Sequence, residues 1–171
     1  MLTRRQLLGA SALLSSLLLT GCGFHLRGSF TAPFEKLYIQ GNFNNPLIVK
    51  LRQMIEAGSN VTVVGSPNEA DAILELLSDT RTRDILALND RGQAREYTLT
   101  RTVGFRMIAP DGYVYMKPTY FAENRSLAYS DSQFLSFGDE SEKLYRDMQT
   151  DLCNQLLSVI ESIKPRPAAG K

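Results

Sequence analysis

The sequence has few of the residues from which catalytic and metal sites are built. It contains one histidine, His25, and two cysteines, Cys22 and Cys153, among 171 residues. A serine or cysteine nucleophile needs a base, and a zinc site needs several sulfur or imidazole ligands. No glycine-rich phosphate-binding loop is present either. We therefore expect no catalytic residue, no metal ligand and no cofactor. The one enzymatic alternative left open is a lipid-anchored hydrolase that uses serine and carboxylates without histidine.

The sequence also lacks a strong net charge and long apolar segments. The 19 basic and 18 acidic residues nearly cancel, whereas a general nucleic-acid binder is normally strongly basic. The apolar segment 7–19 has 13 residues, some of them serines, and a membrane-spanning helix needs about 20 apolar residues. The charge balance therefore argues against nucleic acid as a partner, and the short segment argues against a permanent transmembrane helix.

The N-terminal segment instead has the form of an export signal. Arg4 and Arg5 precede the apolar segment, which ends in Leu19-Thr20-Gly21-Cys22. A positive start, an apolar middle and small residues before the cleavage point are typical of secretory signals. A cysteine directly after the small residues resembles the lipobox of bacterial lipoproteins. That resemblance implies diacylation of Cys22 through its sulfur, cleavage before it and acylation of its new amine, which gives three acyl chains.

We accordingly predict a signal peptide over residues 1–21 and a lipid anchor at Cys22. Three acyl chains would hold the mature protein firmly to a membrane, because a second chain already makes anchoring stable. Two alternatives stay open. Cys22 could instead pair with Cys153 in a disulfide, and Arg4-Arg5 could belong to a twin-arginine export signal.

The mature chain is predicted to form a single domain. Its 150 residues hold 17 basic and 18 acidic side chains, and a chain of this length can bury a sizeable core. We divide it into a lipidated tether at 22–33, one α/β domain at 34–163 and a tail at 164–171 that we expect to be disordered.

The first part of the domain is predicted to be strand, helix, strand. Residues 35–40 alternate and are rich in strand formers. Asn45 is a suitable helix N-cap with Pro46 at the first helical position, and Gly58 is expected to end the helix in the left-handed conformation. Residues 61–64 are again extended, so the two strands should be parallel and joined by a crossover.

A long hairpin is predicted next. Residues 72–88 begin as an apolar strand and become polar on both faces at 79–84, so we expect this part to protrude. Residues 89–93 are typical of a tight turn with Gly92 at positive φ. The apolar face of the return strand consists of Tyr97, Leu99, Val103, Phe105 and Met107. Arg101 interrupts this face, and the alternation indicates an antiparallel sheet with one polar side.

After a turn at 110–112, a fourth strand is expected from 113 to about 121, with Pro118 marking an edge. Residues 122–138 are interpreted as a loop, and Asp139 as the cap of a final helix that runs to about 163. Cys153 lies on its apolar face, where it is expected to act as a small buried hydrophobe. The predicted fold is α+β, with about four mostly antiparallel strands and two helices packed on one face as a two-layer sandwich.

The middle two strands and their turn carry six arginines: Arg81, Arg83, Arg91, Arg95, Arg101 and Arg106. Arginine can bind phosphate through two parallel hydrogen bonds. Acidic residues are interleaved with these arginines, so the alternative of ordinary solvated or interface charges is favoured over a phosphate site.

Several segments together resemble one family of bacterial lipoproteins. They are Cys22 to Gly28, Gly92 to Leu99, Tyr120 to Tyr129 and the long final helix. In this combination the chain is similar to the LptE family of outer-membrane lipopolysaccharide-assembly lipoproteins. The resemblance extends over the whole mature chain.

The resemblance implies a partner, a ligand and a location. LptE plugs the lumen of the β-barrel LptD and helps to assemble it, and the pair delivers lipopolysaccharide (LPS) to the outer leaflet. The protein would be anchored by Cys22 at the periplasmic face of the outer membrane, with its body inside the barrel. The candidate LPS contacts are then Arg91 first, followed by Arg95, Arg81 and Arg83. The alternative is an accessory lipoprotein of another envelope transport system.

Overall fold

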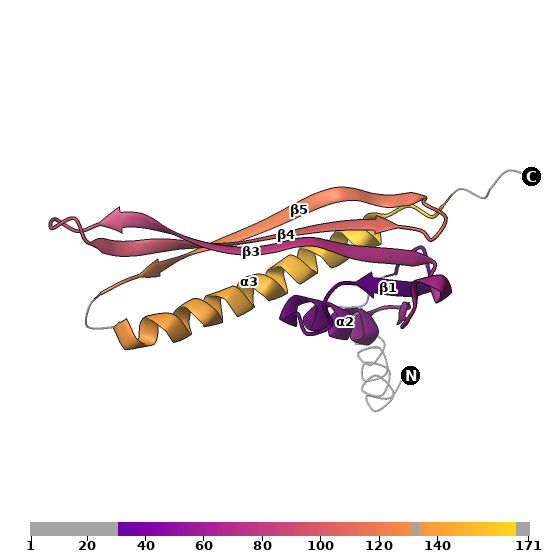
Figure 1. The fold of residues 1–171 in the computed structure, drawn as a ribbon, viewed down its shortest axis with the longest axis horizontal. Coiled ribbons are helices and arrows are strands. Elements are labelled where there is room, and N and C mark those ends of the chain that lie inside the picture. The colour runs from indigo at the N-terminus through magenta and orange to yellow at the C-terminus, as the bar shows by residue number, and fades with distance from the viewer. Residues whose placement is uncertain (1–30, 131–133, 167–171) are drawn as a thin grey trace, which may run out of the picture.

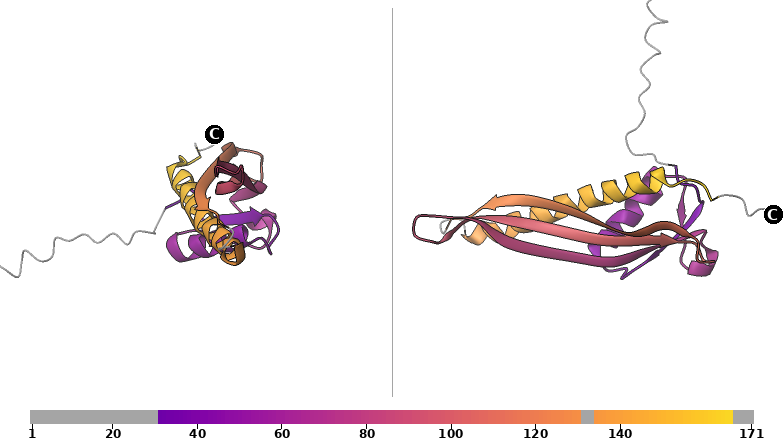
Figure 2. Two further views of the ribbon diagram at one scale, coloured as in Figure 1. Left: turned by 90° about the vertical axis from the view of Figure 1, so that its left-hand side faces the viewer. Right: turned by 90° about the horizontal axis from the view of Figure 1, so that it is seen from above.

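The computed structural model describes residues 31–130 and 134–166. Along the chain it contains β1 (Lys36–Gln40), α2 (Pro46–Gly58), β2 (Thr62–Val63), the 3₁₀ turn η2 (Pro67–Glu69), β3 (Ala72–Leu88), β4 (Ala94–Ile108), β5 (Val114–Ala128) and α3 (Phe134–Ser162). Figure 1 shows β3, β4 and β5 as a long twisted ribbon, with α3 running beneath it and α2 beneath one end. The second view agrees that both helices lie on the same side of the sheet (Figure 2).

The strands form one mixed sheet in the order β2-β1-β3-β4-β5. β1 is parallel to both β2 and β3, whereas the β3–β4 and β4–β5 pairs are antiparallel. The α+β fold with two helices on one face and the parallel strands flanking α2 are thus confirmed. The sheet has five strands where about four were expected, and the predicted extended segment at 61–64 forms its edge strand β2 beside β1.

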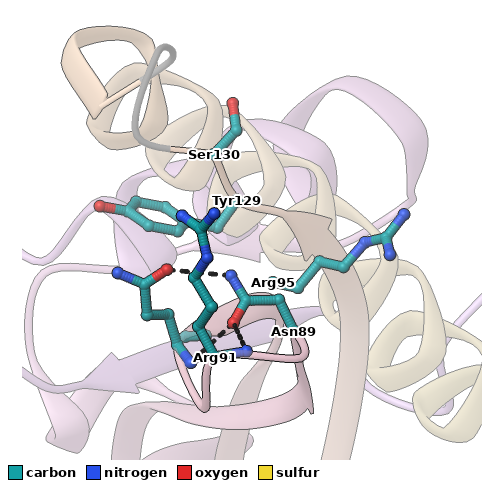
Figure 3. A pocket seen from close by; sticks show the side chains of 7 residues that line it. Asn89, Arg91, Arg95, Tyr129 and Ser130 are labelled. Carbon is teal, nitrogen blue, oxygen red and sulfur yellow. Dashed lines mark hydrogen bonds between the residues drawn. The ribbon is translucent and has the colours of Figure 1, made fainter.

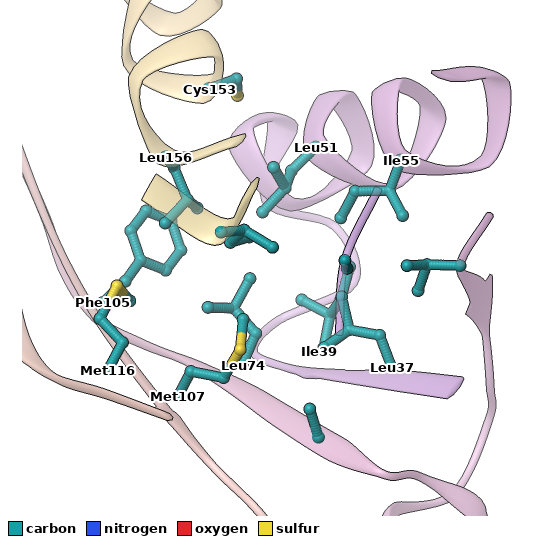
Figure 4. Packing of buried hydrophobic residues seen from close by; sticks show 14 of the residues in the cluster. Leu37, Ile39, Leu51, Ile55, Leu74, Phe105, Met107, Met116, Cys153 and Leu156 are labelled. Atoms are coloured by element: carbon teal, nitrogen blue, oxygen red, sulfur yellow. The ribbon is translucent and has the colours of Figure 1, made fainter. Parts of the chain in front are cut away.

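The main hydrophobic core lies where α2 and the C-terminal half of α3 cover the sheet (Figure 4). Leu51 and Ile55 of α2 meet Leu37 and Ile39 of β1, while Leu156 of α3 packs in the same cluster. Each of these side chains is almost inaccessible to solvent. Burial of a leucine or isoleucine contributes about 1.5–3 kcal/mol, so this cluster fixes the base of the ribbon.

A second, smaller cluster lies further along the ribbon. Leu99 of β4 and Leu127 of β5 pack there against Tyr145 and Met148 of α3. Phe137 joins this cluster as a partly buried neighbour. This packing holds the N-terminal half of α3 under the part of the ribbon that extends beyond α2.

The predicted cap at Asn45 and the predicted turn at Gly92 are confirmed, whereas the prediction at Gly58 is wrong. The Asn45 side chain accepts a hydrogen bond from the N–H of Leu47 at 2.8 Å, and Gly92 has φ of 74° in the hairpin turn. Gly58 was expected in the left-handed region, but among the described residues only Gly92 and Gly112 have positive φ. α2 ends at Gly58 with Ser59 as its C-cap, which is extended and whose hydroxyl donates to the carbonyl of Ile55 at 2.7 Å.

The predicted end of the fourth strand and start of the last helix are both wrong. β5 continues to Ala128, because Glu123 and Arg125 on its inner face bind polar side chains of α3. Because Glu123 and Arg125 are charged, this part of β5 lacks the apolar alternation that predicts a strand. α3 begins at Phe134 and so already includes Asp139. Phe137 packs against the second cluster, which accounts for a helix that begins before the predicted cap Asp139.

The final helix buries Cys153 as predicted. The residue is a free thiol, 1% exposed, in the main cluster, and burial raises its pKa to about 11. Cys22 and the tether up to residue 30 lie outside the described residues, as do residues 167–171 of the tail. Arg166, at the start of the tail, pairs with Asp111 at 2.6 Å.

Candidate functional site

The turn between β3 and β4 is organised by one side chain, that of Asn89. Its oxygen accepts hydrogen bonds from the N–H groups of Arg91 at 3.0 Å and Gln93 at 2.9 Å. The N–H of Asn89 donates to the carbonyl of Gln93 at 2.8 Å, and Gly92 supplies the positive φ that closes the turn. These bonds fix the backbone from which the Arg91 side chain projects (Figure 3).

A shallow pocket of about 360 Å³ lies beside this turn. Its lining consists of Asn89, Arg91, Gln93, Ala94, Arg95, Tyr129 and Ser130. In Figure 3 the Arg91 guanidinium lies near the Tyr129 ring, whereas Arg95 extends away from it. Both arginines are exposed, and within the described part of the chain neither forms an ion pair. The Arg91 guanidinium, without a carboxylate partner, makes this pocket suitable for an anion, and Arg95 adds a second positive charge nearby.

The strand that leads into the turn is apolar and exposed. Ile85, Leu86 and Leu88 are each 57–58% accessible to solvent. The tip of the ribbon therefore presents apolar side chains next to two cationic ones. An amphiphile with an anionic head group would find complementary chemistry here.

Of the four predicted candidate arginines, only Arg91 and Arg95 line this pocket, and Arg81 and Arg83 lie away from it. Arg81 pairs with Glu142 of α3 at 3.1 Å and lies over the ring of Tyr145. Arg83 lies over the rings of Tyr97 and Phe137, 5.3 and 5.6 Å from their centroids. Both side chains thus help to join the ribbon to α3.

The remaining two arginines are also engaged within the chain. Arg106 pairs with Glu75 of the neighbouring strand. Arg101 is 1% exposed and forms two hydrogen bonds of 2.9 Å with the carboxylate of Asp79. It also donates to the side chain of Gln149 at 2.9 Å. The interruption of the apolar face by Arg101 is therefore structural, and its partners on β3 and α3 could not be identified from sequence spacing.

The buried ion pair changes the titration of Asp79. Burial by itself would raise the pKa of this carboxyl, but hydrogen bonds from Arg101 and Asn45 and the charge of Arg101 outweigh it. The net result is a lowered pKa, so Asp79 is ionised at neutral pH.

Residues 31–130 and 134–166 contain no group of three or more histidine, cysteine or acidic side chains arranged for a metal ion. No helix in the same ranges is long and apolar enough to cross a membrane.

Comparison with known proteins identifies the family. The model of the family described as "LptE: Lipopolysaccharide-assembly" matches residues 34–160. The chain belongs to the LptE family. It is 30% identical over 160 residues to the LPS-assembly lipoprotein LptE of Photorhabdus laumondii, with 90% of this chain and 86% of the relative covered. A second LptE, from Yersinia enterocolitica, is 28% identical, with 84% of this chain and 70% of the relative covered.

Solved structures of lipoproteins share the LptE fold described above. The solution structure of lipoprotein B from Nitrosomonas europaea has a TM-score of 0.70 and 29% identity, covering 82% of this chain and 91% of its own. The crystal structure of the rare lipoprotein B from Shewanella oneidensis has a TM-score of 0.66 at 22% identity, covering 75% and 95%.

LptE proteins are lipoproteins of LPS assembly and not enzymes, which confirms the prediction that this chain has no catalytic role. Membership places the chain in the cell envelope and in LPS assembly. Sequence reasoning found the turn arginines because the turn itself was predictable. It missed the contribution of Tyr129, because the strand that carries the chain to this residue was interpreted as a loop.

Proposed function

We propose that this LptE protein plugs the lumen of the LptD β-barrel, helps to assemble that barrel and assists LPS delivery to the outer leaflet. In this proposal Cys22 carries the lipid anchor at the periplasmic face of the outer membrane. The elongated body supports the proposal (Figure 2). So does the sheet face opposite α3, where the ribbon carries the threonines Thr80, Thr82, Thr98, Thr100 and Thr102. A polar face suits a water-lined barrel lumen.

The observation that carries the LPS part of the proposal is the tip of the ribbon. Arg91 and Arg95 stand there without carboxylate partners among the described residues, next to the exposed Ile85, Leu86 and Leu88. LPS combines phosphates and sugars with acyl chains. Guanidinium groups bind phosphate bidentately, and the apolar residues offer contact for chains, so the tip matches both parts of the ligand.

Charge reversal at the tip tests this contact. We expect Arg91→Glu to weaken LPS binding about tenfold or more, because a charge-assisted bond of 1.5–3 kcal/mol is lost and a repulsion is added. Titration of the purified protein with LPS would measure the effect, and Arg95→Glu should act in the same direction. Arg166→Glu is the matched control, since Arg166 lies at the opposite end of the sheet. Unchanged LPS affinity in both tip variants would contradict the assignment.

Purification of the full-length, lipidated protein from outer membranes tests the partner. A large β-barrel protein that remains bound in stoichiometric amount in mild detergent is the expected result. Cys22→Ser, which removes the acylation site, should reduce the recovery from outer membranes. An inner-membrane transporter in place of the barrel would favour the accessory-lipoprotein alternative.

A further inference from the structure

β5 is the last strand of the sheet, so one of its edges is without a strand partner among the described residues. Its pairing with β4 is regular from Glu96 opposite Ala128 to Phe105 opposite Thr119. The irregularities in this pair, and Pro118, lie beyond Thr119. Ten consecutive residues at about 3.4 Å each form an open edge of about 34 Å without a register irregularity.

The backbone groups that face this edge can be identified from the pairing. The N–H of Tyr129 donates to the carbonyl of Arg95 at 2.7 Å, so Tyr129 is bonded towards β4. Successive residues of an antiparallel strand bond to opposite sides. The residues that face outwards are therefore Tyr120, Ala122, Asn124, Ser126 and Ala128, all of them exposed. In agreement, the carbonyl of Asn124 is bonded by the Arg125 side chain at 2.7 Å and retains a second lone pair.

The opposite long edge of the ribbon, formed by β3, is protected against strand pairing, whereas the edge of β5 is not. β1 covers β3 only from Ala72 to Glu75. Beyond that point β3 has three irregularities in its register and bears Asp79, Arg81, Arg83 and Asp84. Bulges and charges of this kind prevent unwanted strand pairing. The regular edge of β5 has no bulge, and its two charged side chains are bound by α3 and by each other.

The surface next to the β5 edge carries an excess of negative charge. Arg125 pairs with Glu123 at 2.8 Å and with Asp151 of α3 at 2.6 Å. Gln155 of α3 donates to Glu123, and Asp147 is a further carboxylate close enough to act on Arg125. Figure 2 shows α3 alongside β5. Three carboxylates thus face one guanidinium on the helix side of the edge.

We propose that residues 119–128 of β5 bind an extended segment of the partner polypeptide as an added strand, and that this segment carries lysine or arginine at alternate positions. Main-chain hydrogen bonds to the five outward residues would supply affinity, as in other strand-addition interfaces. The carboxylates beside α3 would select the basic side chains. The inference rests on the proposed function, because it describes how the protein binds its barrel partner.

Amide hydrogen exchange of the co-purified complex tests the proposal. Strand addition should slow the exchange of Ala122, Asn124 and Ser126 at least tenfold relative to the free lipidated protein. The N–H groups of Phe121 and Glu123 are already bonded to β4 and should not change. This period of two distinguishes strand addition from burial under a side-chain contact. An intact complex in which the outward amides exchange as in the free protein would overturn the inference and leave the proposed function standing.

A proline variant provides the second measurement. Ala122→Pro removes an outward N–H and places a ring on the edge, where the fold itself tolerates it. We expect about tenfold weaker recovery of the partner and an unchanged unfolding midpoint. Ala122→Ser, which retains the N–H, is the control and should recover the partner normally. Equal recovery with both variants would contradict strand addition.

If no barrel co-purifies, the proposed function fails, and strand addition at the β5 edge is then tested by a separate experiment. A photo-crosslinker in place of Ser126 would then be activated in intact cells. Capture of one defined segment with alternating basic residues would support strand addition. Absence of a crosslink, or a crosslink to a second copy of this chain, would overturn it.

Discussion

Arg101 illustrates how a single charged residue can be accommodated in an apolar face. Its guanidinium donates to Asp79, to Gln149 and to the carbonyl of Tyr145 at 3.3 Å. Gln149 in turn donates to the carbonyl of Pro46 at 2.9 Å. These bonds join β3, β4, α3 and the start of α2. No buried side-chain nitrogen or oxygen in the described ranges lacks a hydrogen-bond partner, so the cost of burying the charge is offset.

Truncation of Arg101 should be strongly destabilising. Arg101→Met leaves the Asp79 side chain, which is 16% exposed, without its partner, and loss of one member of a buried pair costs about 3–5 kcal/mol. Urea denaturation would measure the free energy of unfolding. The double variant with Asp79→Asn should recover part of the loss, because no unpaired charge is left. A cost below about 1 kcal/mol for the single variant would contradict this account.

The same pair predicts a dependence of stability on pH. The pKa of Asp79 is lower in the folded protein than in the unfolded chain, where it is about 3.9. Its contribution to stability is therefore complete above about pH 4 and is lost as the pH falls through the lowered folded pKa. The difference in unfolding free energy between wild type and Asp79→Asn should shrink from pH 7 to pH 2. A constant difference over this range would show that the ionised form is not favoured by folding.

At the scale of elements, the sequence predicted segments whose signals are local. The Asn45 cap, the turn at Gly92 and the alternation of β4 depend on neighbouring residues, and all three are present. Prediction failed where a distant contact decides the structure. The second half of β5 has polar residues on both faces because Glu123 and Arg125 bind α3.

The candidate site shows the same division. The turn between β3 and β4 was predictable, and so was the position of Arg91 and Arg95 on it. The contacts of Arg81 with Glu142 and of Arg83 with aromatic rings could not be predicted, because α3 lies about 60 residues away in the sequence. Sequence spacing places residues on a face but does not reveal what covers that face.

Gly104 and Tyr120 provide a test of the pairing between β4 and β5. They are opposite each other, and a Cβ on Gly104 would lie 2.6 Å from the Tyr120 ring. We expect Gly104→Ala to reduce the free energy of unfolding by about 1–2 kcal/mol. In the background of Tyr120→Ala the same substitution should cost less, because the ring is gone. A double-mutant cycle would measure this coupling, and additive effects would contradict contact between the two positions.

At the scale of the whole molecule, the protein has two hydrophobic clusters separated by the Arg101 network. The larger cluster contains α2 and β1, and the smaller one contains Leu99, Leu127, Tyr145 and Met148. A cluster of four buried residues contributes much less apolar burial than the main core. The part of the ribbon beyond Arg101 should therefore open without unfolding the base.

Native-state hydrogen exchange would detect this opening. Amides of Thr98 and Leu99 should exchange through a transition of lower free energy than amides of Ile39 and Leu51. Arg101→Met should widen the gap between the two transitions. Exchange of all four amides through a single global transition would show instead that the clusters unfold together.

The length of the ribbon has a geometric consequence. β3 contains 17 residues and therefore spans about 56 Å at 3.3 Å per residue, compared with about 30 Å for the hydrocarbon core of a bilayer. Because side chains alternate with a period of two, the ribbon can be lengthened or shortened without exchanging its faces only in steps of about 7 Å. The length of the ribbon can therefore be adapted to membrane thickness only in steps of two residues per strand.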